Sequence, residues 1–385
     1  MKPQLVRGGA GVASSVVMQR PVITEKPAGE VGGRQVYRYV LANAAGMTVE
    51  ILSYGGIVRS IEFPDRSGEP RNIVLGFKAL QEYVKYNPAP TLANTEAAGA
   101  YFGALVGRYA NRIAGGQFEI ERNDHRVPIN NGTNALHGGD VGFDQKVWSP
   151  TVVRDDGVVG LRLEYLSPAG EMGFPGKLET VATYTLDNDN RLMLTFQATT
   201  DATTVLNLTN HTYWNLAGES TGTVHDQMLY INADAYLPVN EGLVPTGQIL
   251  PVAETPFDFR TPTAIGERIR DGDPQLVNGH GYDHNWVLNQ TSPRSLVLAA
   301  TAWDPKTGRG LNVHTTQPGL QFYAGNFLNG TLIGSGEHIY RQSDGFAFET
   351  QHFPDAPNHP AFPSTELRPG EKYEETSIFE LFCVR

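Results

Sequence analysis

Hydrophobic and polar residues alternate with a period of two along most of the chain. Leu192, Leu194 and Phe196, for example, are separated by Met193, Thr195 and Gln197. Such alternation is typical of strands with one buried face. Runs of this kind predict strands over residues 36–41, 49–54, 161–165, 180–186, 192–198, 296–300, 310–315 and 373–381.

Helical periodicity is rare. It predicts one or two turns over residues 78–84, and again over 264–269 behind Pro262, a residue suited to an early helical position. Neither a repeat nor a linker divides the sequence. We therefore expect an all-β protein: one large antiparallel β-sandwich with a few short helices over residues 31–385, preceded by a loosely ordered arm over residues 1–30.

Composition and charge narrow the possible functions. The chain of 385 residues has 30 Lys and Arg against 41 Asp and Glu, a formal net charge of −11. Nucleic acid and anionic membranes are bound by neutralising phosphates, so neither is an expected partner. Cys383 is the only cysteine, so no internal disulfide or zinc–thiolate site can form. We expect a cytoplasmic monomer or homodimer, with a periplasmic or secreted location left open.

Six segments combine charged or amide side chains with aromatic rings, a mixture that suits a sugar, whose hydroxyls need polar partners and whose C–H faces need an aromatic surface. Two long loops, over residues 241–260 and 350–369, are also rich in aromatic residues, and loops of this length are usually functional. The segments are GRYANRIAGG (107–116), NALHGGDVGFD (134–144), NLTNHTYWNLAG (207–218), GYDHNW (281–286), TTQPGLQFYAGN (315–326) and FETQHFPDAPNHPAFP (348–363).

The order and wording of these segments, with SIEFPDRSGEPRNIVLGF before them and STELRPGEKY after them, resemble the aldose 1-epimerase (galactose mutarotase) family from about Val36 to the C-terminus. The resemblance implies a large β-sandwich that binds a free sugar and interconverts its α and β anomers without a metal or organic cofactor. The first thirty or so residues have no counterpart in the family's pattern.

The resemblance also implies roles for individual residues. Glu349 in FETQ matches the catalytic base and His211 in NHTYW the catalytic acid. Tyr213 and Trp214 are candidates for a stacking surface, and the roles of His284 and His352 stay open. The positions that match sugar-binding residues are Arg112, His137, Asp283 and Gln317, with Asn111 as a weaker addition.

The chemistry explains why these residue types are needed. Opening a hemiacetal ring takes the proton from the C1 hydroxyl while the ring oxygen gains one, so two proton carriers act together. A carboxylate and an imidazole, with ordinary pKa values of about 4.3 and 6.5, suit these roles near neutral pH. In the period-two pattern, Glu349 lies opposite the face of Phe346 and Phe348, and His211 opposite that of Leu206 and Leu208.

Four other functions are alternatives to anomer interconversion. A metal hydrolase is disfavoured because the ten histidines form no HxH or HExxH spacing. A glycoside hydrolase would use two carboxylates, for which Glu349 and Asp283 are candidates. A non-catalytic carbohydrate-binding module would share the sugar surface without needing Glu349 and His211. An epimerase of a phosphorylated sugar would need more cations than Arg112 and Arg108.

Overall fold

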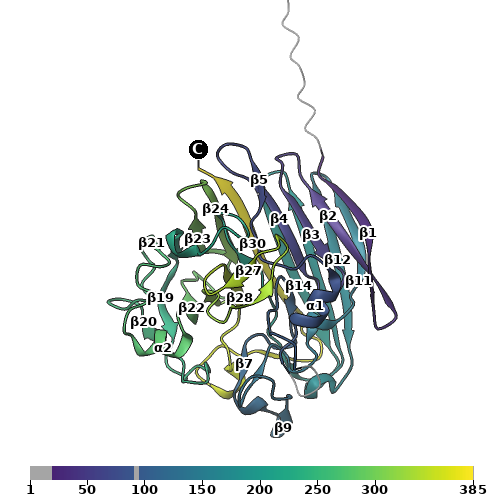
Figure 1. The fold of residues 1–385 in the computed structure, drawn as a ribbon. Helices are drawn as coiled ribbons and strands as arrows, with labels where there is room; N and C mark the ends of the chain where they lie inside the picture. The colour runs from purple at the N-terminus through teal and green to yellow at the C-terminus, as the bar shows by residue number, and fades with distance from the viewer. Residues whose placement is uncertain (1–19, 91–94, 385) are drawn as a thin grey trace, which may run out of the picture.

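The computed structural model describes residues 20–90 and 95–384, which form a β-sandwich built from three main sheets (Figure 1). Every pairing between named strands in these residues is antiparallel, and helices are few and short, which confirms the predicted fold class. The two α-helices of the described residues are α1 (Leu80–Tyr86) and α2 (Pro274–Gly279).

The N-terminal sheet is a meander of five strands in the order β1-β2-β3-β4-β5. Its first strand begins at Val22, so residues 22–30 belong to the sandwich and not to the loose arm expected there; residues 1–19 lie outside the described residues. The strands are β1 (Val22–Val31), β2 (Arg34–Ala42), β3 (Thr48–Leu52), β4 (Val58–Pro64) and β5 (Pro70–Asn72).

The largest sheet has nine strands in the order β11-β12-β13-β14-β30-β24-β23-β18-β21. The C-terminal strand β30 lies in its middle, between β14 and β24. The strands are β11 (Ser149–Asp155), β12 (Val158–Ser167), β13 (Leu178–Asp187), β14 (Arg191–Thr200), β18 (Met228–Ile231), β21 (Thr263–Ala264), β23 (Val297–Trp303), β24 (Arg309–Thr315) and β30 (Tyr373–Cys383).

The third sheet has six strands in the order β17-β28-β25-β22-β19-β20 and carries the candidate site. Its strands are β17 (Tyr213–Trp214), β19 (Ala233–Leu237), β20 (Leu250–Pro251), β22 (Asp283–Leu288), β25 (Gly319–Tyr323) and β28 (Phe346–Gln351).

Short two-stranded pairings complete the chain. They are β6 (Leu105–Val106) with β16 (Thr209–Asn210), β7 (Arg112–Ile113) with β10 (Ala135–Leu136), β8 (Gln117–Ile120) with β9 (Asn123–Arg126), β15 (Thr204–Val205) with β29 (Glu366–Leu367), and β26 (Asn329–Ile333) with β27 (Ile339–Arg341).

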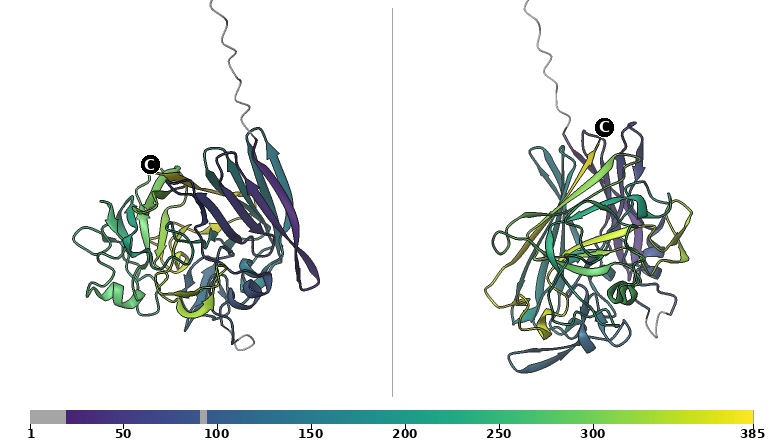
Figure 2. Two further views of the ribbon diagram at one scale, coloured as in Figure 1. Left: turned by 45° about the horizontal axis from the view of Figure 1, so that its top comes forward. Right: turned by 90° about the vertical axis from the view of Figure 1, so that its left-hand side faces the viewer.

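One hydrophobic core joins the three main sheets. It contains Leu41 of the five-stranded sheet, Leu194 of the nine-stranded sheet and Phe322 of the six-stranded sheet, all buried. The five-stranded sheet lies against β11–β14 at one end of the largest sheet, and the six-stranded sheet lies towards the other end (Figure 2). The buried aromatic face of the six-stranded sheet fixes it to this core, so its opposite face is a firm support for polar side chains.

The helix predictions had mixed outcomes. Residues 78–84 overlap α1, but the predicted helix over 264–269 is wrong: Ala264 ends strand β21, which pairs with β18, and residues 265–269 are turns and bends. The second helix begins later, at Pro274, where the Asp273 side chain accepts from the backbone N–H of Gln275 as an N-cap. None of the helices in the described part of the chain is long and apolar enough to span a membrane.

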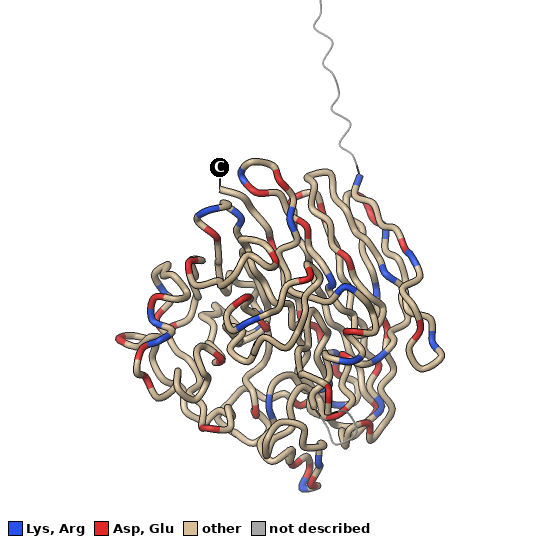
Figure 3. The backbone as a smooth tube through the Cα atoms, in the orientation of Figure 1, with Lys and Arg blue, Asp and Glu red and all other residues tan. Residues whose placement is uncertain are grey.

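Charged residues of both signs are interspersed along the described chain (Figure 3). Many of them form exposed ion pairs, such as Lys78 with Glu337 and Lys306 with Asp226. Such exposed pairs contribute little to stability. The buried charged groups are therefore the informative ones.

Candidate active site

Strand β28 carries the first of these groups. Phe346 and Phe348 point into the core, and Glu349 lies on the opposite face with only 2% of its surface exposed, as the period-two pattern predicted. Gln321 of β25 is its register partner. Gln321 donates a hydrogen bond of 2.7 Å to Oδ1 of Asp283 on the next strand, β22. Glu349, Gln321 and Asp283 thus form one polar row across three strands.

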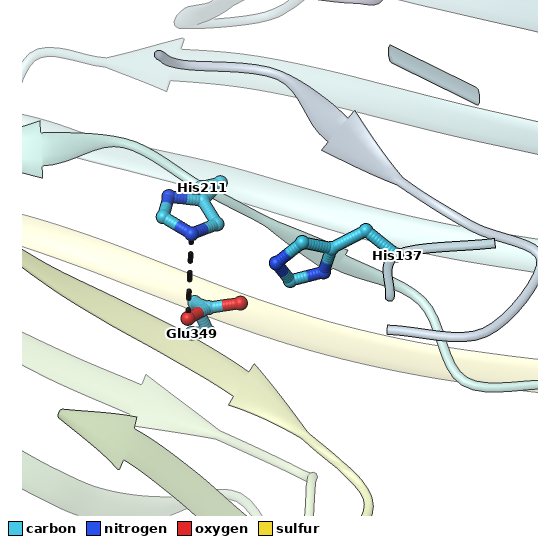
Figure 4. A group of neighbouring side chains, drawn as sticks. All are labelled: His137, His211 and Glu349. Atoms are coloured by element: carbon cyan, nitrogen blue, oxygen red, sulfur yellow. Dashed lines mark ion pairs between the residues drawn. The ribbon is translucent and has the colours of Figure 1, made fainter. Parts of the chain in front are cut away.

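The imidazole of His211 comes to this row from the turn between β16 and β17. The His211 backbone N–H donates to the Ala104 carbonyl at 2.9 Å, and its Nε2 lies 3.6 Å from Oε1 of Glu349 (Figure 4). The rings of Tyr213 and Tyr101 stack on the imidazole, with centroids 5.0 Å and 6.0 Å away. Aromatic contacts of this kind hold a ring plane fixed, so the imidazole is aimed at Glu349 before any substrate arrives.

The β7–β10 pair supplies the opposite wall, with Arg112 at its start and His137 just after its end. Nδ1 of His137 accepts from the backbone N–H of Asn111 at 3.1 Å, so in the neutral imidazole the proton is on Nε2. Arg112 donates from Nε to Oδ1 of Asn131 at 3.1 Å, and its Nη1 lies 4.0 Å from Oδ2 of Asp283. His137 and Arg112 are therefore both donors.

A cavity of about 610 Å³ connects these groups. Of the residues predicted from the sequence, it is lined by Glu349, His211, Arg112, His137, Asp283 and Asn111. The structure thus brings together all of the predicted site residues except Gln317.

Gln317 lies elsewhere. It precedes β25 and is 1% exposed, its Nε2 donates to the Tyr373 hydroxyl at 3.0 Å, and it does not line the cavity. The prediction for Gln317 is therefore corrected: the glutamine next to Glu349 is Gln321. The signal was in the sequence, because Gln321 alternates with the core residues Leu320 and Phe322, as a site-facing residue of a strand should.

The aromatic predictions are also revised. Tyr213 lines the cavity, whereas Trp214 is 1% exposed and packs against Phe379 in the core. Tyr101 was missed, although it lines the cavity and contacts both His211 and His137. The sequence left the roles of His284 and His352 open. His284 is buried and His352 is half-buried, and neither side chain lines the cavity.

Burial shifts the pKa values of Glu349 and His211 in opposite directions. It raises the pKa of Glu349 well above its ordinary value, an effect increased by Asp283 and opposed by Arg112. It lowers the pKa of His211 to about 4. Burial, His211 and Arg112 likewise lower the pKa of His137. In the sugar-free site, burial therefore favours the neutral form of both Glu349 and His211.

The three groups in Figure 4 are of types that can bind a metal ion. His137, His211 and Glu349 offer ligand atoms within 4.8 Å of one another. A metal on Nε2 of His137 would move its proton to Nδ1, which would then face the N–H of Asn111. The donor set therefore does not fit a three-residue metal site, because His137 is held as a hydrogen-bond donor.

A β-sandwich with a buried carboxylate and imidazole in a cavity of polar donors and acceptors defines an acid–base enzyme for a small polar substrate. Comparisons with known proteins identify the family of this enzyme. Residues 37–380 match the family model of aldose 1-epimerases. The chain belongs to the aldose 1-epimerase family, and its activity is the interconversion of sugar anomers, an isomerisation.

Several relatives share nearly the whole chain. Galactose mutarotase of Rattus norvegicus is 41% identical over 95% of this chain and 98% of its own length. Aldose 1-epimerase of Escherichia coli is 37% identical over 94% of this chain and 100% of its own. The crystal structure of galactose 1-epimerase from Lactobacillus acidophilus superposes with a TM-score of 0.81 at 32% identity, covering 94% of this chain and 99% of that one.

Proposed function

We propose that the protein interconverts the α and β anomers of free aldohexoses such as glucose and galactose, with Glu349 and His211 as the proton carriers. The observation that carries the proposal is the separation of 3.6 Å between Nε2 of His211 and Oε1 of Glu349 inside the cavity. The C1 hydroxyl and the ring oxygen are bonded to the same carbon. Two groups that exchange protons with both oxygens must therefore lie within a few ångströms of each other.

The proposed reaction balances without a co-reactant. Glu349 takes the proton of the C1 hydroxyl, the C1–O bond of the ring breaks as the C1 carbonyl forms, and His211 protonates the released ring oxygen. Rotation about C1–C2 presents the other face of the aldehyde, and the reverse proton transfers close the ring. Arg112 favours the carboxylate form of Glu349, which is the form that opens the ring.

The remaining groups of the cavity would hold the sugar hydroxyls. Arg112 and Nε2 of His137 are donors, and Asp283, whose Oδ1 is held by Gln321, is an acceptor. Asn111 also lines the cavity. Arg112 is a fixed donor because a guanidinium does not deprotonate readily.

Polarimetry tests the proposal. Freshly dissolved α-glucose or α-galactose should approach its equilibrium rotation faster with the protein than in buffer alone, and xylose and arabinose would define the substrate range. Binding without acceleration would instead indicate a non-catalytic binding module. Release of reducing sugar from a glycoside would indicate a hydrolase, and a preference for glucose 6-phosphate an epimerase of phosphorylated sugars.

A further inference from the structure

The loop after β28 reaches across the cavity wall to β7. At Asp355 the backbone is left-handed, with φ of 56°, just before the short 3₁₀ turn η5 (Ala356–Asn358). The backbone N–H of Asp355 donates to the carbonyl of Arg112 at 3.0 Å, and its Oδ1 accepts from the backbone N–H of Ala114 at 3.0 Å. Asp355 therefore holds the chain at Arg112 and again two residues later.

The Asp355 carboxylate is itself held firmly. Oδ1 also accepts from Nδ2 of Asn358 at 2.6 Å, and Oδ2 lies 3.2 Å from Nε2 of His359. The side chain is 2% exposed, and Asn358 makes a second bond to the carbonyl of Gln117 at 2.9 Å. Charged hydrogen bonds in such a buried position are strong and directional, so the loop and β7 form one unit.

This unit matters because β7 cannot fix its own position. It pairs with β10 through only two residues, Arg112 and Ile113. Arg112 is held at its N–H by Oδ1 of Asn111 (2.8 Å) and at its carbonyl by Asp355. Asp355 also follows Glu349 by six residues in the same segment, so it connects the strand of the proposed base to the strand of a proposed sugar-binding residue.

We propose that Asp355 is a positioning residue, which sets the place of the Arg112 guanidinium relative to Glu349 and Asp283 without itself lining the cavity. The inference rests on the proposed role of Arg112 in holding the sugar. Displacing such a group by about 1 Å can cost up to two orders of magnitude in rate. The effect should fall mainly on KM, since Arg112 binds hydroxyls and does not transfer a proton.

Four variants test the inference by polarimetry on galactose: Asp355→Ala, Asp355→Asn, Arg112→Ala and the double variant Asp355→Ala/Arg112→Ala. Asp355→Ala should raise KM about tenfold with a smaller change in kcat. Asp355→Asn should stay near the wild type because an amide oxygen can still accept from Ala114. In the Arg112→Ala background, Asp355→Ala should cause no further rise, since coupled residues are not additive.

Asp304→Ala is the matched control. Asp304 is also 2% exposed and accepts from a backbone N–H, that of Thr307 at 2.7 Å, but in the turn between β23 and β24. It should lower the melting temperature without raising KM. If Asp355→Ala does not fold, Asn358→Ala, which removes one donor to the carboxylate, should raise KM a few-fold.

Two outcomes would overturn the inference: an unchanged KM in folded Asp355→Ala or Asn358→Ala, or a rise in KM for Asp355→Ala that multiplies fully with that of Arg112→Ala. Failure of the proposed function would look different. In that case the wild type would show no acceleration, or Arg112→Ala alone would leave KM unchanged.

Discussion

Replacing Glu349 with glutamine separates catalysis from stability. The amide keeps the size of the side chain but cannot take a proton, and a proton-transfer group typically contributes about 10²–10⁴ in rate. The loss expected in kcat is therefore about 3–5 kcal/mol of activation free energy. Sugar binding should be nearly unchanged, because Arg112, His137 and Asp283 remain.

The same variant should be at least as stable as the wild type above neutral pH. Because burial raises the pKa of Glu349 in the folded protein, the folded state binds more protons than the unfolded state. The carboxylate therefore destabilises the fold increasingly as pH rises above the unfolded pKa of about 4.3. Glutamine removes that cost, so the thermal midpoint at pH 8 should rise, and at pH 4 it should not change.

Glu375→Gln is the matched control. Glu375 is 2% exposed and accepts from the Thr316 hydroxyl, but it does not line the cavity. Burial raises its pKa from 4.5 to about 7. At about 1.4 kcal/mol per pKa unit, ionising it at pH 8 costs roughly 3 kcal/mol. Glu375→Gln should gain stability at pH 8 and keep full mutarotation. Polarimetry and thermal melts give both readouts, and full activity in Glu349→Gln would refute the reasoning.

Three further predictions follow from the pKa values and the corrected site. Because Glu349 must be a carboxylate to open the ring and burial raises its pKa, kcat/KM should begin to fall on the acid side well above the ordinary carboxyl pKa of about 4.3; an acid limb at that ordinary value would contradict this. Gln321→Leu should raise KM about tenfold, because Asp283 loses the hydrogen bond that holds it. Gln317→Leu should keep full activity and lose about 1 kcal/mol of stability, because it loses the hydrogen bond to Tyr373. Equal kinetics in the two variants would count against Gln321 as the glutamine of the site. Burial raises the pKa of Asp144 to about 7, so Asp144→Asn should raise the melting temperature at pH 8 more than at pH 4, and a uniform shift would argue against a titrating carboxyl.

The strands could be predicted because their pattern is local. Each buried face needs an apolar residue at every second position, so the runs around Leu194 and Leu163 show it directly. The helix predicted over residues 264–269 did not form: Ala264 pairs with β18, a contact distant in sequence, and residues 265–269 are turns and bends. The Asp273 cap and Pro274, by contrast, were readable helix signals.

The sequence predicted most of the residues that gather at the cavity, but not their pKa values. Of the seven residues predicted from the order of the motifs, six lie at the cavity. The error at Gln317 arose because the alternation of core-facing and site-facing positions along the strand, which favours Gln321, was not used to choose between the two glutamines. The pKa values could not be read from the sequence, because they depend on the burial of Glu349 and His211, which many distant segments create together. The same holds for Tyr101, which meets the imidazole only in the folded chain.

The central place of β30 in the largest sheet has a consequence for synthesis on the ribosome. Strands β14 and β24 are both complete long before residues 373–383 are made, and each then presents an unpaired edge of backbone donors and acceptors. Such edges invite pairing with other chains. A nascent chain of this protein is therefore expected to stay prone to association until residues 373–383 emerge and insert between the two halves of the sheet.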